Sequence, residues 1–143
     1  MALVLAPAYL ADKSALARMQ LPAVAGRLEP LIERGEVATC GMVELEVLWS
    51  ARGAEDLQEV RQEWSLSFPR IAMAEDDFRR AAEVMELLAL RGHHRSAKIP
   101  NLLIAAVAER SSLTVLHYDR DFDLVAEVTG QRSEWIVPAG TVP

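Results

Sequence analysis

The sequence predicts an α/β protein with a central parallel sheet of four to five strands and helices on both faces. Short apolar runs alternate along the chain with longer segments whose apolar residues recur at helical spacing. Helices between successive strands are typical of parallel sheets, because each parallel connection must cross over the sheet. The segment Leu102–Ala108 is apolar on all sides, as a helix buried against a sheet should be.

The chain has the size and composition of one domain. It contains 143 residues, of which 51% are hydrophobic, and this is ample for one continuous core. No internal repeat and no low-complexity segment divides the sequence. We therefore expect a single domain over residues 1–143.

Five strands are expected between the helices. The first, Ala8–Ala11, is a short apolar run that stops at Asp12, and the last ends before Pro138. The runs between them are equally short, as strands of a buried parallel sheet usually are. The remaining predicted strands are residues 36–40, 69–73, 114–118 and 135–137.

The expected helices begin and end at recognisable signals. Ser14 stands where the N-cap of a first helix would lie, and Pro22 and Pro100 suit the first turn of later helices. Gly35 and Gly92 follow helix ends, where a left-handed backbone is common. After the first helix, the predicted helices cover residues 22–34, 42–51, 55–66, 76–91, 100–108 and 122–128.

Charge and cysteine content exclude several classes of protein. A net charge of −6 argues against a broadly basic surface that would hold nucleic acid by charge alone, so a polyanionic substrate would need local basic patches or a metal. The single Cys40 cannot form an internal disulfide, which favours a reducing cytoplasm. Residues 1–11 are apolar but too short to span a membrane and lack a basic start, so we expect a buried first strand with a loose leader, with a signal peptide as the lesser alternative.

Four carboxylates occupy the corners where predicted strands turn into helices. Asp12 ends the first strand, Glu44 lies in the first turns after the second, and Asp119 and Asp121 follow the strand ending at Tyr118. Ligands of open α/β sheets bind at these carboxyl ends of the strands. Gathered carboxylates repel one another unless a cation neutralises them, which points to Mg²⁺ or Mn²⁺ and to phosphodiester hydrolysis.

Each acidic residue also has a simpler explanation when it is taken alone. Asp12 could merely end a strand, and Asp119 or Asp121 could be a helix N-cap. Glu44 could be a solvated helix residue, although it shares a helical face with Leu48 and Ala51, and that phase places Glu46 on the outer side. The joint pattern is stronger than any single residue.

Four motifs in this order resemble the PIN-domain ribonucleases, and most closely the VapC toxins of bacterial toxin–antitoxin pairs. The resemblance runs from about Tyr9 to Val137. The motifs that carry it are Tyr9-Leu10-Ala11-Asp12-Lys13-Ser14-Ala15, Val43-Glu44-Leu45, Ile99-Pro100-Asn101-Leu102-Leu103-Ile104-Ala105-Ala106 and Tyr118-Asp119-Arg120-Asp121-Phe122.

The resemblance implies a PIN-like fold and Mg²⁺- or Mn²⁺-dependent endonucleolytic cleavage of RNA. It also implies a VapB-like antitoxin that silences the toxin, and a homodimer. By position, Asp12, Glu44, Asp119 and Asp121 match the acidic metal-site residues of the family, and Ser14 matches the small hydroxyl residue after the first Asp. No membrane association is implied.

One position departs from the family pattern. Asn101 stands where the family has Asp after the Pro, and an amide oxygen can contact a metal but brings no charge. We therefore expect a normal fold, weak metal binding and reduced RNA cleavage. The alternative is a catalytically silent PIN-like module that binds an antitoxin or RNA without cutting it. A third possibility, a receiver-type phosphoacceptor domain, lacks the adjacent pair of acids that such domains need.

Basic and aromatic residues outside the acidic set are further candidates. Arg95, Lys98 and Arg120 are candidates for contacts with RNA phosphates, against the alternative of a solvated basic surface. Aromatic and aliphatic side chains of the early helices could line a groove for an antitoxin or pack in the core; these are Trp49, Leu57, Trp64 and Phe68. A largely exposed Trp49 or Trp64 would favour the groove.

Overall fold

The computed structural model describes residues 6–143 and contains one five-stranded parallel sheet. The strands are β1 (Tyr9–Ala11), β2 (Val37–Cys40), β3 (Arg70–Ile71), β4 (Thr114–His117) and β5 (Ser133–Trp135), in the spatial order β3-β2-β1-β4-β5. Leu10 lies opposite Ala38 on one side and Val115 on the other. The predicted parallel sheet is confirmed, and the expectation for residues 1–5 lies outside the described residues.

The last strand is found two residues earlier than the apolar run indicates. Ser133 pairs with Val115, and Trp135 pairs with His117 at the end of the ladder. Ile136, just after the strand, is buried, and its backbone N–H still donates to the His117 carbonyl at 2.7 Å. The predicted range, residues 135–137, therefore began inside the strand and ran past its end. The reason is that β5 lies at the sheet edge, where polar side chains can face water.

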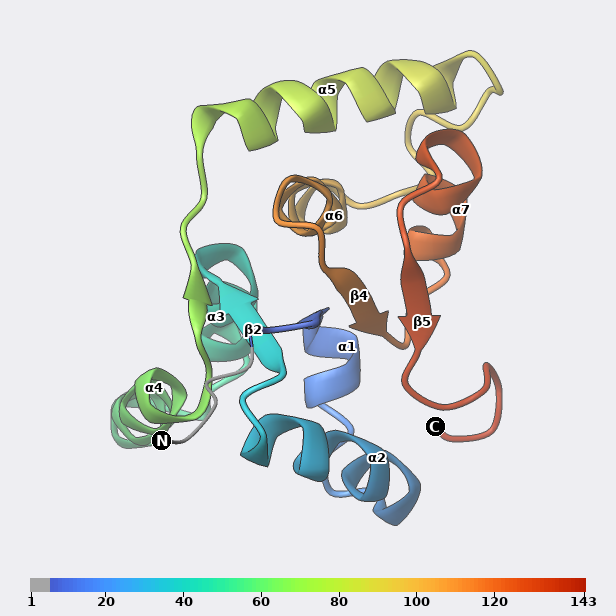
Figure 1. Ribbon diagram of the computed structural model, residues 1–143. Helices are drawn as coiled ribbons and strands as arrows, with labels where there is room; N and C mark the ends of the chain where they lie inside the picture. Colours follow the sequence, from blue (N-terminus) through green and yellow to red (C-terminus); the bar gives the residue numbers. More distant parts are fainter. Residues whose placement is uncertain (1–5) are drawn as a thin grey trace.

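Helices cover both faces of the sheet, as predicted (Figure 1). In Figure 1, α1 (Lys13–Leu16) and α2 (Pro22–Glu33) lie below the sheet, while α6 (Ile99–Arg110) lies above it with α5 (Glu75–Ala89) crossing over α6. The remaining helices are α3 (Gly41–Trp49), α4 (Ala54–Ser67) and α7 (Asp121–Thr129). Within the described residues, none of these helices has the length and apolar character to cross a bilayer.

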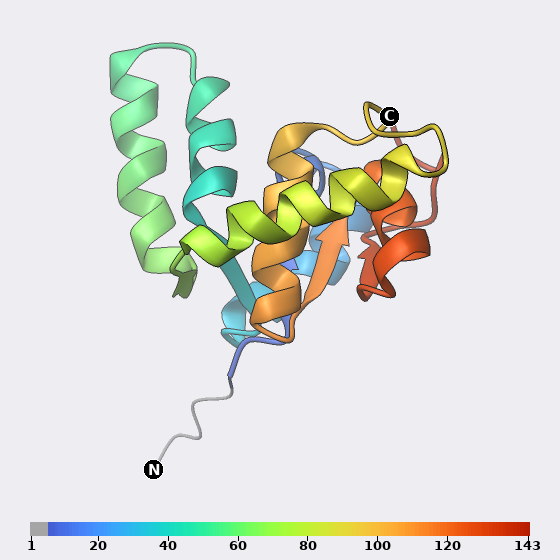
Figure 2. The ribbon, with the colours of Figure 1, turned by 90° about the horizontal axis from the view of Figure 1, so that it is seen from above.

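Helices α3 and α4 form a hairpin that stands out from the body of the molecule (Figure 2). We call this hairpin, residues 41–67, the arm. Helix α3 leaves the carboxyl end of β2 and runs to the tip of the arm, and α4 returns to its base. The arm therefore rises on the side of the sheet toward which the parallel strands point.

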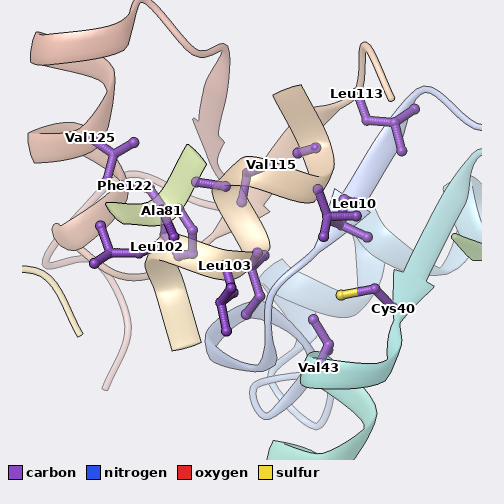
Figure 3. Close-up of a cluster of buried hydrophobic side chains, with 14 of the residues drawn as sticks. Leu10, Cys40, Val43, Ala81, Leu102, Leu103, Leu113, Val115, Phe122 and Val125 are labelled. Carbon is purple, nitrogen blue, oxygen red and sulfur yellow. The ribbon is translucent and has the colours of Figure 1, made fainter. Parts of the chain in front are cut away.

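The main core lies between α6 and the sheet (Figure 3). Leu10 and Val115 project from neighbouring strands onto Leu102 and its neighbours in α6, where every residue from Asn101 to Ala108 is buried. A side chain of this size contributes roughly 1.5–3 kcal/mol when it is fully buried. The strand ends and the start of α6 are consequently held in fixed relation by this main core.

His117, at the end of β4, is a fully buried polar residue beside the main core, to which Phe122 belongs. Its ring packs between Phe122 and Trp135, with centroids 4.9 and 5.1 Å away. Nδ1 accepts a hydrogen bond from the Asp119 backbone N–H at 3.1 Å, so the proton of the neutral ring sits on Nε2. Burial lowers the pKa of His117 from 6.5 to about 4, against the opposing charges of Asp123 and Asp119.

This burial predicts that the fold loses stability in mild acid. His117 binds a proton near pH 6.5 in the unfolded chain but only near pH 4 in the folded chain. The contribution of neutral His117 to the free energy of unfolding is therefore fully present above pH 6.5, and the free energy of unfolding falls by about 3 kcal/mol as the pH drops to 4. Urea unfolding of the chain and of His117→Asn, in EDTA, measures the difference between the two pH profiles. Parallel profiles would show that His117 does not titrate with unfolding.

Candidate metal centre

Asp12 lies at the carboxyl end of β1, where its carboxylate caps the short helix α1. Oδ2 accepts the Ser14 backbone N–H at 3.0 Å and the Ser14 hydroxyl at 2.6 Å. Oδ1 is buried and has no partner among the described residues. Burial raises the pKa of Asp12 above its ordinary value, the Ser14 hydrogen bonds oppose that shift, and the charge of Asp119 adds to it.

Ser14 connects the carboxyl end of β1 to the carboxyl end of β4. Its hydroxyl donates to Asp12 and accepts the Tyr118 backbone N–H at 2.8 Å. Because β1 and β4 are neighbours in the sheet, this one side chain can reach both strand ends. A small hydroxyl residue at this position therefore orients Asp12 beside Asp119.

Asp119, Asp121 and Asn101 form a second, hydrogen-bonded group. The Asp121 backbone N–H donates to Asp119 Oδ1 at 2.9 Å, and the Lys98 backbone N–H donates to Asp121 Oδ2 at 2.8 Å. The Asn101 side-chain Nδ2 donates to Asp119 Oδ2 at 3.1 Å and to Asp121 Oδ2 at 2.9 Å. The first turn of α6 and the corner after β4 are thus joined through one amide group.

Glu44 is not part of this cluster. It forms an ion pair with Arg70 of β3, away from the other acids. Glu46 faces the cluster instead: burial raises its pKa, and the charges of Asp12 and Asp119 raise it further. Its Oε1 is buried without a partner in the described chain. The expectation that Glu46 lies on the outer side of the helix is therefore wrong.

The phase of α3 explains the error. Val43 is buried and Val47 packs against the core, so the inward face of α3 passes through both residues. Glu46 lies three residues after Val43 on that face. Leu48, on which the expectation of an inward-facing Glu44 was based, is absent from the core cluster. Recognising Val43 and Val47 as core positions would have found Glu46 from the sequence.

The chemistry of these side chains fits a divalent cation. Asp12 Oδ1 and Glu46 Oε1 are buried oxygens that lack a partner within residues 6–143, and Asp119 and Asp121 add two more carboxylates. Hard cations prefer oxygen ligands of this kind, and their charge would offset the repulsion among the acids. The side chains that would hold the cation are Asp12, Asp119 and Asp121, with the amide oxygen of Asn101, and Glu46 faces the same cluster.

The arrangement of these side chains falls short of a closed ligand set. Over residues 6–143, no three Asp, Glu, His or Cys side chains converge closely enough to hold a metal ion. Asn101 supplies a physical reason, because its amide N–H groups occupy oxygens of Asp119 and Asp121 that a cation would use. Asp at this position would repel those two carboxylates in the absence of a cation.

The predicted RNA-binding residues lie at different distances from the cluster. Lys98 Nζ is 3.7 Å from Asp119 Oδ2, and the lysine side chain is exposed. Arg120 is exposed between the two acids of its corner, and Arg95 is exposed in the loop before α6. Lys98 is thus placed beside the acidic cluster, and the assignment of all three to RNA contacts remains a prediction.

The two candidate tryptophans of the arm differ sharply. Trp64 is only 8% exposed and packs against Phe68, with ring centroids 4.8 Å apart, and Leu57 is half-buried. Trp49 is 89% exposed. Trp64 and Phe68 therefore belong to the core cluster at the base of the arm, while Trp49 meets the condition set for a binding surface.

Comparison with known sequences identifies relatives across nearly the whole chain. The family model described as PIN domain matches residues 9–128. Two proteins of Mycobacterium tuberculosis, Ribonuclease VapC51 and Ribonuclease VapC21, are 48% and 47% identical to this chain, over 94% and 93% of it and 96% of each relative.

Solved structures share the same fold. A VapBC complex of Salmonella typhimurium bound to DNA matches with a TM-score of 0.73 at 14% identity, over 92% of this chain and 99% of that one. VapBC-5 of Mycobacterium tuberculosis matches with a TM-score of 0.59 at 26% identity, over 92% of this chain and all of that one. The resemblance inferred from four short motifs is confirmed, and the chain belongs to the PIN-domain family, among the VapC ribonucleases.

Proposed function

We propose that this chain is the toxin of a type II toxin–antitoxin pair, a metal-dependent endoribonuclease whose activity is reduced by Asn101. The observation that carries the proposal is the pair of buried, unpartnered carboxylate oxygens, Asp12 Oδ1 and Glu46 Oε1, beside Asp119 and Asp121. PIN-domain ribonucleases are generally metal-dependent, and the relatives named as ribonucleases are nearly half identical over the same length.

The cation we propose is Mg²⁺ or Mn²⁺, since the donor set consists of hard oxygen atoms. When bound, such an ion would polarise a phosphodiester and lower the pKa of an attacking water. Glu46 has a raised pKa and a free buried oxygen, so it is suited to accept the proton of that water. Lys98, beside Asp119, is suited to hold a neighbouring phosphate of the RNA.

The partners we propose follow from the relatives. The matching structures are toxin–antitoxin complexes, which supports a VapB-like antitoxin as the protein partner. We further propose a homodimer that acts in the cytoplasm, where its RNA substrate is present.

A second candidate function is a silent binding module with the same partners. It is favoured by the Asn101 amide, which bridges Asp119 and Asp121 without a cation. The two candidates differ only in whether the acidic cluster can be made to cut RNA, so one substitution separates them.

Asn101→Asp is expected to increase Mn²⁺-dependent RNA cleavage by at least about tenfold, because a further carboxylate replaces an amide that blocks two others. The measurement compares cleavage of total RNA by the chain and by Asn101→Asp, with EDTA as a control. Asp12→Asn combined with Asn101→Asp should abolish the gain. Absence of cleavage by both the chain and Asn101→Asp would favour the silent binding module, whereas equal and measurable cleavage by both would show that Asn101 does not reduce activity.

Glu46 and Glu44 offer a matched pair of carboxylates on one helix. In the Asn101→Asp background, Glu46→Gln should reduce cleavage by about a hundredfold, because it removes a proton acceptor at the cluster. Glu44→Gln should leave cleavage nearly unchanged, because Glu44 pairs with Arg70. Single-turnover cleavage rates test both variants, and the reverse order of effects would assign the role to Glu44.

A further inference from the structure

Trp49 ends α3 at the tip of the arm, with its indole in water. It lies three residues after Glu46 on α3, and the two side chains line one surface hollow of about 260 Å³ together with Lys13, Met42 and Leu45. Glu46, which faces the acidic cluster, and the exposed indole therefore border the same hollow.

Exposure of this size is unusual for the largest apolar side chain. Trp49 is 89% exposed and Leu45, on the same hollow, is 62% exposed. Exposed apolar groups that lie together at the border of a polar site often mark a binding surface. The other tryptophan of the arm, Trp64, is buried, so packing of the arm does not require Trp49.

One cation shares the hollow with the indole, and a second follows Trp49 closely in the chain. Lys13 lines the hollow and its charge acts on Glu46, yet it forms no ion pair among the described residues. Arg52, just beyond Trp49, is 91% exposed and is 3.7 Å from Asp56. An exposed aromatic ring with basic side chains nearby is the pattern by which proteins hold single-stranded nucleic acid, with bases stacked on the ring and phosphates near the cations.

We infer that Trp49 stacks on an unpaired base of the RNA, next to the phosphate that is cut. The inference rests on the proposed function, because the scissile phosphate must lie at the acidic cluster for the adjoining nucleotide to reach the hollow. The indole would bind the face of a base, which all four bases share, so it would position the strand without reading its sequence. Lys13 would hold the phosphate between that base and the cluster.

Variants that distinguish stacking on an aromatic ring from contact with an apolar surface test the inference. Trp49→Phe keeps a stacking face, whereas Trp49→Leu keeps only apolar area. In EDTA, a short single-stranded RNA of mixed sequence should bind the chain and Trp49→Phe similarly, and should bind Trp49→Leu about tenfold more weakly, as expected for the loss of one base stack. Fluorescence anisotropy of labelled RNA measures the affinities.

The matched control is Leu66→Ala, since Leu66 is also 89% exposed but lies near the end of α4, at the base of the arm. It should not change RNA binding. Tryptophan emission adds a signature that a structural role would not produce: RNA should quench the emission of the chain but quench Trp49→Phe much less, because Trp49 is the exposed fluorophore.

Three further outcomes separate the base stack from a protein interface and from the nuclease proposal. If Trp49→Leu binds RNA as the chain does but loses self-association in sedimentation, or loses binding to an antitoxin, Trp49 belongs to a protein interface. If Asn101→Asp cuts RNA and adding Trp49→Leu leaves KM unchanged, the base stack fails while the proposed function stands. If Asn101→Asp cannot cut but Trp49→Leu still weakens RNA binding, the nuclease proposal fails and the base stack stands.

Discussion

The site depends on a single electrostatic constraint, which is that several negative charges must share one small region at the carboxyl ends of β1 and β4. The strand order makes this unavoidable, because β1 and β4 are neighbours and each ends in an acidic corner. Asp12 is buried there with one oxygen unpartnered, and its pKa is raised. A buried charge without a counter-charge costs free energy, so the fold tolerates this corner at the expense of stability.

The chain relieves the constraint with neutral and local donors. Ser14 satisfies one oxygen of Asp12, the Lys98 backbone N–H satisfies Asp121, and the Asn101 amide bridges Asp121 and Asp119. Asn101 thus does part of what a bound cation would do, since it brings N–H donors to carboxylates that otherwise repel. The same contact stands in the way of a cation, which would require the amide to turn its oxygen inward. Stability without metal and activity with metal therefore oppose each other at this residue.

Much of this arrangement was predictable from the sequence, because it follows from strand ends. Asp12, Asp119 and Asp121 lie at corners that chain connectivity alone brings to one edge of a parallel sheet. Asn101 was predictable for the same reason, as Pro100 marks the start of a helix that enters at that edge. The sheet itself followed from the alternation of strand and helix, and its family relationship from four short motifs.

Glu46 was not predictable from strand ends, because a helix residue is placed by rotation about the helix axis. The apolar residues Leu48 and Ala51 suggested that the helical face through Glu44 points inward. In the structure, α3 instead packs Val43 and Val47 against the core. The start of β5 was missed for a related reason, since an edge strand needs no apolar residue at Ser133 or Glu134. In both cases the outcome depends on which surface of the helix or strand is covered by other elements of the fold. The local sequence pattern does not contain that information.

The placement of α3 also shows how an acidic protein can hold a polyanion. With a net charge of −6, the surface as a whole repels RNA, and attraction must come from the few cations near the cluster. Lys98 and Lys13 lie at that edge, yet their charges are partly offset by Asp119 and Glu46. An exposed indole adds affinity that does not depend on charge and is not weakened by the neighbouring carboxylates. On our proposals, one helix that turns Glu46 toward the cluster and leaves Trp49 in water would supply both a proton acceptor and a ring that holds the strand.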